Sequence, residues 1–128
     1  MANYLLNTHT AIWFFEENEQ LSGFADAAIR HYQNNIYLNI ASLWEIAIKI
    51  NIGKLKLGVT IEDFSISCFQ NKIQIVPIQI RHLNTYIELP LLHRDPFDRL
   101  IIANAITDNL KIFTKDPQIR QYPVQTIW

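Results

Sequence analysis

Short apolar runs alternate along the chain with longer segments in which apolar residues recur at helical spacing. Runs rich in leucine, isoleucine and valine are typical of buried strands, and they occur at residues 3–6, 36–39, 73–77, 111–114 and 124–128. Between them, apolar residues three and four positions apart predict helices, at residues 8–15, 22–33, 42–50, 60–70, 80–88 and 96–109. The pattern therefore predicts an alternation of strands and helices.

Such an alternation favours one fold class. Strands that are separated by helices pair in parallel through right-handed crossovers, and the helices then cover both faces of the sheet. The segment 96–109 is apolar on nearly every side, which predicts a buried helix. We therefore expect an α/β protein, a three-layer sandwich with a central, mostly parallel five-stranded sheet, built as a single domain over residues 1–128.

Composition and charge narrow the possible functions. The chain has 49% hydrophobic and 18% charged residues, as expected of a globular protein. Its 11 basic and 12 acidic side chains give a net charge of −1, which argues against binding nucleic acid by bulk charge but still allows a nuclease with a central acidic site. The lone Cys68 excludes an internal disulfide and a cysteine zinc cluster. With no targeting segment or membrane span recognised, we expect a cytoplasmic protein without a membrane partner.

Polar residues gather where the predicted strands end. Asn7 follows the first strand, Glu45 lies in the helix after the second, Asp95 and Asp98 begin the helix before the fourth, and Asp116 follows the fourth. In open α/β sheets the carboxyl ends of the strands form the ligand site. Clustered carboxylates repel one another unless a cation joins them, and oxygen ligands suit Mg²⁺ or Mn²⁺. A metal of this kind activates water and stabilises a phosphoryl oxygen, which points to phosphodiester hydrolysis.

Each of these acids also has a structural interpretation. Ser42-Leu43-Trp44-Glu45 matches a helix capping box, in which Glu45 would bond only the backbone of the cap. Asp95 before a proline is typical of a helix cap, and Asp116 before a proline is typical of a turn. The pattern alone leaves both interpretations open.

Four blocks of the sequence carry a resemblance to a known family. Residues 4–9 (YLLNTH) resemble the opening Y-L-L-D-T-H of PIN-domain toxins of the VapC type. Residues 42–49 (SLWEIAIK), 93–100 (HRDPFDRL) and 113–116 (FTKD) resemble the second, third and fourth blocks of the same family, in the same order. The resemblance covers nearly the whole chain.

This resemblance implies a PIN-like fold and a Mg²⁺-dependent endoribonuclease, the toxin of a toxin–antitoxin pair. It implies RNA as the substrate and a homodimer whose groove a cognate antitoxin peptide fills. By position, Glu45, Asp98 and Asp116 match the acidic catalytic residues and metal ligands of the family. Asn7 stands where the family has an aspartate, and Asp95 is expected to cap the helix and aim Asp98.

The asparagine at position 7 changes the expected activity. Asn7 keeps a carbonyl oxygen that can bind a cation but lacks the charge, so four acids become three, and we expect weakened metal binding and catalysis. Its amide could also turn toward neighbouring carboxylates. The alternative is a catalytically inactive PIN-fold protein that sequesters an antitoxin or pairs with an active toxin. A receiver-like or phosphatase-like domain is disfavoured because Asn7 cannot accept a phosphoryl group.

Several neighbours of these residues are further candidates. Lys49, Arg94 and Arg99 flank the acidic blocks and could bind RNA phosphates or antitoxin carboxylates; the alternative for each is a place on the solvated surface, which is favoured for Lys49. Thr8 and Thr114 adjoin site positions and are expected to support the site by bonding a metal-bound water or a carboxylate; Thr8 could instead cap its helix.

Overall fold

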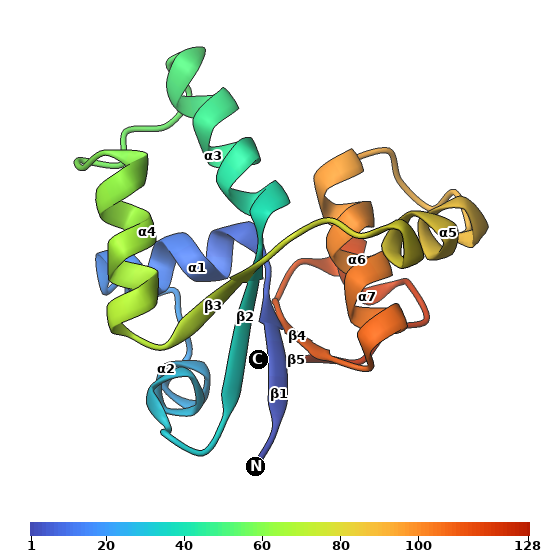
Figure 1. Ribbon diagram of the computed structural model, residues 1–128, viewed down its shortest axis with the longest axis horizontal. Coiled ribbons are helices and arrows are strands. Elements are labelled where there is room, and N and C mark those ends of the chain that lie inside the picture. Colours follow the sequence, from blue (N-terminus) through green and yellow to red (C-terminus); the bar gives the residue numbers. More distant parts are fainter.

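The computed structural model describes residues 1–128 and contains one five-stranded sheet (Figure 1). All four strand pairings are parallel, so the expected parallel sheet is confirmed without an antiparallel exception. The spatial order is β3-β2-β1-β4-β5, which places the first strand at the centre. The strands are β1 (Asn3–Leu6), β2 (Asn35–Asn39), β3 (Ile73–Val76), β4 (Lys111–Phe113) and β5 (Thr126–Ile127).

Seven helices cover the sheet, in two groups that lie on opposite sides of it in Figure 1. One group is α1 (Thr8–Glu16), α2 (Gly23–Arg30), α3 (Ile40–Asn51) and α4 (Ile61–Gln70). The other group is α5 (Ile80–Glu88), α6 (Pro96–Asp108) and the short α7 (Pro117–Arg120). The predicted three-layer α/β sandwich is confirmed. No helix is both long enough and apolar enough to cross a membrane.

The side chains of β1 alternate between two hydrophobic cores. Tyr4 and Leu6 belong to a cluster of 16 buried residues on the α1–α4 side of the sheet. Leu5, between them, belongs to a cluster of 9 buried residues on the α6 side. Parallel strands are apolar on both faces because helices cover both, which explains the unbroken apolar run that predicted β1. Helix α6 is buried over residues 99–105, as its apolar sequence predicted.

Helix α3 begins earlier than its sequence suggested. Ser42 was expected to cap it, but the cap is Asn39, whose side-chain oxygen accepts a hydrogen bond from the backbone N–H of Ala41 at 2.9 Å. Ser42 lies inside the helix, and its oxygen accepts a hydrogen bond from the Thr8 hydroxyl at 3.0 Å. The expected capping box between Ser42 and Glu45 is therefore wrong. Because α3 follows β2 without a loop, Asn39 at the end of the strand is the residue placed to accept from the unpaired backbone N–H groups of the first helical turn.

Helix α7 was not expected. Asp116 and Pro117 were interpreted as a turn, yet Asp116 caps a single helical turn in which Pro117 takes the first position. A proline there loses no helical hydrogen bond, so the same dipeptide can begin a turn or a short helix.

Candidate functional site

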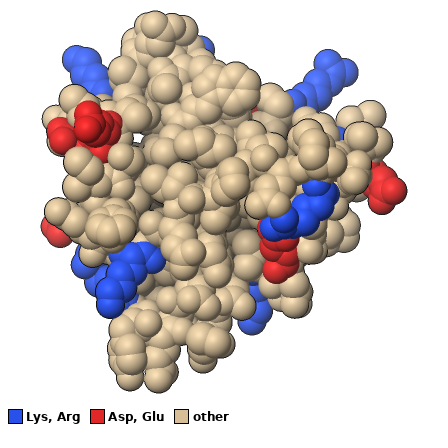
Figure 2. Space-filling model, in the orientation of Figure 1, with Lys and Arg blue, Asp and Glu red and all other residues tan.

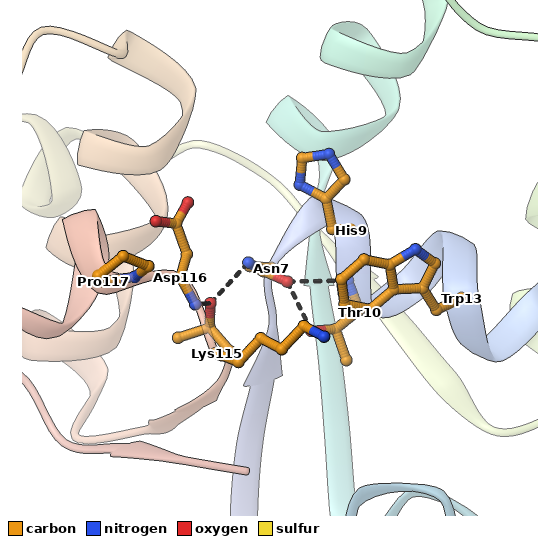
Figure 3. Close-up of a pocket in the computed structure, with 8 residues that line it drawn as sticks. Asn7, His9, Thr10, Trp13, Lys115, Asp116 and Pro117 are labelled. Atoms are coloured by element: carbon orange, nitrogen blue, oxygen red, sulfur yellow. Dashed lines mark hydrogen bonds between the residues drawn. The ribbon is translucent and has the colours of Figure 1, made fainter. Parts of the chain in front are cut away.

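Asn7 and Thr114 occupy equivalent places at the carboxyl ends of the two central strands. They directly follow Leu6 and Phe113, which are register partners of β1 and β4. The Asn7 Nδ2 donates a hydrogen bond to the Thr114 hydroxyl oxygen at 2.8 Å, although the two residues lie 107 positions apart in the sequence (Figure 3). Strand pairing thus brings the first and fourth sequence blocks together.

Both polar atoms of the Asn7 amide are hydrogen-bonded, and the oxygen caps α1. Its oxygen accepts hydrogen bonds from the backbone N–H and the hydroxyl of Thr10, at 2.8 and 2.6 Å. The side chain is buried, with 4% of the residue exposed. The amide nitrogen points to Thr114 and not to a carboxylate, so the expectation that it could turn toward the acids is wrong. Thr8 does not cap the helix; its hydroxyl joins α1 to α3 through Ser42.

Asp116 stands three residues beyond β4, beside Asn7. One carboxylate oxygen accepts the Gln118 backbone N–H at 2.9 Å and so caps α7. The backbone N–H of Asp116 donates to the Thr114 hydroxyl oxygen at 3.0 Å, so Thr114 connects Asn7 to Asp116. The remaining carboxylate oxygen of Asp116 makes no hydrogen bond within the protein, which leaves it free for a ligand.

Glu45 carries a carboxylate with only one of its oxygens partnered. The residue is buried on α3, 5% exposed, and its Oε2 lies 2.9 Å from the Lys49 ammonium. Its Oε1 is also buried, without a hydrogen-bond partner. An unpaired buried carboxylate oxygen is costly, so it marks a place where a donor or a cation would be stabilised. The Lys49 ammonium therefore has its partner within the protein.

The pKa of Asp98 indicates that several other carboxylates lie near it. Its pKa is raised to about 6, first by burial and then by repulsion from Asp95, with smaller contributions from Glu45 and Asp116. A hydrogen bond with His93 acts in the opposite direction and lowers the pKa. Asp95 caps α6 by accepting the backbone N–H groups of Phe97 and Asp98, at 2.9 and 3.0 Å. Its expected role as a helix cap is therefore confirmed.

His93 was not expected to take part in the site. Its Nε2 lies 3.1 Å from the Asp98 carboxylate, and its Nδ1 lies 2.7 Å from the Tyr122 hydroxyl. Tyr122 also accepts a hydrogen bond from the Arg99 guanidinium at 3.0 Å. The position of His93, five residues before Asp98, was a signal, but the partner Tyr122 could not be found from local sequence.

The three candidate cations have different surroundings. Arg99 is buried, and its guanidinium donates to Tyr122 and to the Pro90 carbonyl oxygen, so it holds the protein together and does not face a ligand. Lys49 pairs with Glu45. Arg94 is exposed and forms no ion pair within the protein.

The acids fit a hydrated metal ion better than a closed metal cage. No group of three histidine, cysteine, aspartate or glutamate side chains is close enough to hold an ion directly. The unpartnered oxygen of Glu45 and the repulsion that raises the Asp98 pKa are both features that a cation would relieve. Mg²⁺ is usually held by one or two carboxylates and keeps several water molecules, which the remaining acids can orient. The donor set therefore fits Mg²⁺ or Mn²⁺.

A cavity of about 300 Å³ opens beside Asn7 and Asp116 (Figure 3). It is lined by Asn7, His9, Thr10, Trp13, Thr114, Lys115, Asp116 and Pro117. His9, Trp13 and Lys115 were not predicted as site residues. Asp116 thus adjoins a cavity of the size in which small ligands bind.

Known proteins resemble the chain in both sequence and fold. The PIN domain family matches residues 4–125. Ribonuclease VapC22 of Mycobacterium tuberculosis is 29% identical over 133 aligned positions that cover the whole of both proteins. The crystal structure of VapBC2 from Rickettsia felis bound to a DNA fragment from their promoter has a chain of the same fold, with a TM-score of 0.72, 19% identity, and 98% of this chain and 97% of that chain covered. The chain therefore belongs to the PIN domain family, and its resemblance to VapC-type toxins is confirmed.

Proposed function

We propose that this protein is a VapC-type toxin, a metal-dependent endoribonuclease whose activity is attenuated by Asn7. The observation that carries the proposal is the cluster of acids around Asp98, whose pKa is raised to about 6 by burial and by neighbouring carboxylates. Folded proteins keep such repulsion mainly where a cation or a reaction needs it. The full-length similarity to Ribonuclease VapC22 supports RNA as the substrate.

Glu45, Asp98 and Asp116 are the proposed metal ligands and catalytic residues. Mg²⁺ bound there would supply an activated water and stabilise negative charge on the phosphate. Glu45 offers its unpartnered Oε1, and Asp116 offers the oxygen that does not cap α7. Asp98 is oriented from two sides, because the Asp95 cap fixes its backbone and His93 bonds its carboxylate.

Asn7 explains the expected attenuation. Its oxygen already accepts two hydrogen bonds from Thr10, and its NH₂ group, which cannot bind a cation, faces Thr114. An aspartate there would place a second oxygen at the position of the NH₂ group, and the Thr114 hydroxyl could donate to it. The chain therefore lacks one negative charge and one accessible oxygen at the site.

Cleavage of a mixed RNA pool tests this proposal. The protein would be compared with Asn7→Asp in Mg²⁺ or Mn²⁺, with EDTA added to parallel samples. We expect the variant to cut and the parent chain to cut weakly or not at all, with EDTA stopping both. Asn71→Asp, which adds the same charge at an exposed position at the end of α4, is the matched control and should leave the parent activity unchanged.

Two other outcomes have distinct meanings. Equal cutting by both proteins would mean that Glu45, Asp98 and Asp116 suffice and that Asn7 does not attenuate. Cutting by neither, together with Mg²⁺ failing to raise the melting temperature of Asn7→Asp, would contradict the nuclease and favour the catalytically inactive binding protein.

A homodimer is part of the proposed function. An apolar groove of about 280 Å³ is lined by Ala41, Trp44, Ile78, Leu83, Tyr86, Pro96, Phe97 and Leu100. Trp44 is 60% exposed, and Ile80 and Ile87 of α5 are 73% and 79% exposed. Exposed apolar surface of this kind favours a protein contact, and a second copy is the proposed occupant. Ile87→Arg should yield a monomer in light scattering, whereas Phe69→Arg, on the exposed face of α4, should not.

A cognate antitoxin is the second proposed partner, and the similar chain in the VapBC2 structure supports it. The cytoplasm is the proposed site of action. The protein would be copurified with the product of an adjoining antitoxin reading frame. Recovery of a stoichiometric complex that blocks cleavage by Asn7→Asp is expected, and free toxin alone would contradict this partner.

A further inference from the structure

Aromatic and cationic side chains form one wall of the cavity beside the acids. His9 and Trp13 are four residues apart on α1, so they share one face of the helix, and their ring centres lie 5.8 Å apart. The Lys115 ammonium lies 4.9 Å from the centre of the Trp13 ring (Figure 3). Trp128 packs edge-on against Trp13 at 5.9 Å and supports it from outside the cavity lining.

These side chains are accessible and only partly used by the fold. The inward face of α1 is buried, whereas His9 is exposed and Trp13 is half-buried. Lys115 is exposed, forms no ion pair, and makes a single hydrogen bond within the protein, to the Gln20 side chain at 3.4 Å. A cation without a carboxylate partner, held beside an acidic cluster, is suited to bind an anion that must approach that cluster.

The remaining surface offers RNA little general attraction. On the face drawn in Figure 2, lysine and arginine side chains are scattered and form no continuous basic patch. The net charge of the chain is −1. Binding of a polyanion must therefore depend on particular cations and on stacking, which is how sequence-tolerant single-strand sites work.

We infer that His9, Trp13 and Lys115 form a nucleotide subsite for single-stranded RNA, in which a base stacks on the Trp13 and His9 rings and Lys115 binds the adjoining phosphate. The inference rests on the proposed function and extends it to substrate binding. Asn7 and Asp116 line the same cavity, so a nucleotide in the subsite would have its neighbouring phosphate beside Asp116. The cavity of about 300 Å³ lies at the small end of the range for ligand sites, which suits a single nucleotide.

Equilibrium binding in EDTA tests the subsite without cleavage. A fluorescent, random-sequence single-stranded RNA of about ten nucleotides would be titrated with the full chain at low salt. We expect Trp13→Ala to weaken binding about tenfold, which corresponds to about 1.4 kcal/mol, and Trp13→Phe to retain most of the affinity. Lys115→Ala should weaken binding and lower the slope of log affinity against log salt by about one, whereas Lys115→Arg should keep both.

The chain offers a matched control for each variant. Tyr32 stacks on His31 with ring centres 5.3 Å apart on an exposed surface, so it repeats the pairing of a histidine with an aromatic ring away from the acids. Lys111 is an exposed lysine outside the cavity lining. Tyr32→Ala and Lys111→Ala should therefore bind RNA as the parent does. Circular dichroism would check that each variant is folded, and Lys115→Ala tests the subsite even if Trp13→Ala fails to fold.

The outcomes separate this inference from the proposed function. Unchanged RNA binding by folded Trp13→Ala and Lys115→Ala, or an equal loss in Tyr32→Ala, would overturn the subsite even if Asn7→Asp cuts RNA. A loss confined to the Trp13 and Lys115 variants would support the subsite even if no variant cuts, in which case the nuclease fails and an RNA-binding protein remains. If the Trp13 and Lys115 variants lost affinity for a copurified antitoxin but bound RNA as the parent does, the subsite would also be overturned, because these side chains would then bind protein.

Discussion

Two aspartates near opposite ends of helix α6 have pKa values shifted in opposite directions. Asp98, in the first turn, has its pKa raised to about 6. Asp108, the last residue of the helix, has its pKa lowered. Burial raises the pKa of both, and hydrogen bonds from its neighbours reverse the shift at Asp108 only.

The helix dipole would produce the opposite result. A carboxylate is favoured at the N-terminus of a helix, where its pKa should fall, and is disfavoured at the C-terminus. Asp108 overcomes the dipole because Arg81 and His82 bond its two oxygens, at 2.9 and 2.8 Å. Asp98 loses the advantage of its position first because it is buried, and then because Asp95, Glu45 and Asp116 repel it.

Of the two aspartates, Asp108 is the one that stabilises the fold. Asp108 lies in a network in which the buried His82, 1% exposed, and Asn104 both have partners. Asp98 has one partner, His93, and several like charges. A satisfied carboxylate stabilises the native state, whereas a repelled one destabilises it, as is common at functional sites.

The largest expected difference is in catalysis. In the Asn7→Asp background, Asp98→Asn should reduce RNA cleavage between about 10²- and 10³-fold, roughly 3–4 kcal/mol, because a proposed metal ligand loses its charge. Asp108→Asn should keep cleavage within about threefold below its melting temperature, since Asp108 lies at the far end of α6. Cleavage rates would be measured at saturating Mg²⁺. Equal losses in the two variants would contradict the distinction between a catalytic Asp98 and a structural Asp108.

For the stability of the fold, Asp108 should matter more than Asp98. Asp108→Ala should lower the free energy of unfolding by about 3 kcal/mol, because it leaves the buried His82 and Asn104 without their carboxylate partner. Urea denaturation would measure this. Asp26→Ala, which breaks the exposed i,i+4 pair with Arg30, is the control and should cost less than about 1 kcal/mol.

Removing the Asp98 charge should stabilise the metal-free protein at neutral pH. With a folded pKa of about 6 against an ordinary value near 3.9, the stability that Asp98 contributes is fully present below about pH 4 and is lost as the pH rises through 6. In EDTA at pH 8, Asp98→Asn should therefore gain about 2–3 kcal/mol in unfolding free energy, and below pH 4 nothing. A gain that does not depend on pH would contradict the assignment.

The smallest expected effect concerns the single partner of Asp98. His93→Ala should raise the Mg²⁺ concentration for half-maximal cleavage about tenfold in the Asn7→Asp background, because the Asp98 carboxylate loses its orienting bond. His31→Ala, at an exposed position, is the control. Loss of cleavage at saturating Mg²⁺ with an unchanged half-maximal concentration would mean that His93 does not position a metal ligand.

Local pattern predicted most elements of the fold. The bounds of β1 and α5 were predicted as they occur, since each depends on the spacing of apolar residues within a few positions. The cap formed by Asp95 was likewise predicted, because its partners lie two and three residues away. The resemblance of four short blocks to PIN-domain toxins also lay in the sequence itself, and the family match bears it out.

Tertiary structure alone decided the contacts that complete the candidate site. The bond from His93 to Tyr122 and the packing of Lys115 on Trp13 both depend on which strand or loop lies beside which. Strand order β3-β2-β1-β4-β5 brings residues more than 100 positions apart within hydrogen-bond reach, as with Asn7 and Thr114. Periodicity records only which face of an element is buried. The sequence therefore determined the elements and the acids, while the pairing of the strands determined which side chains meet.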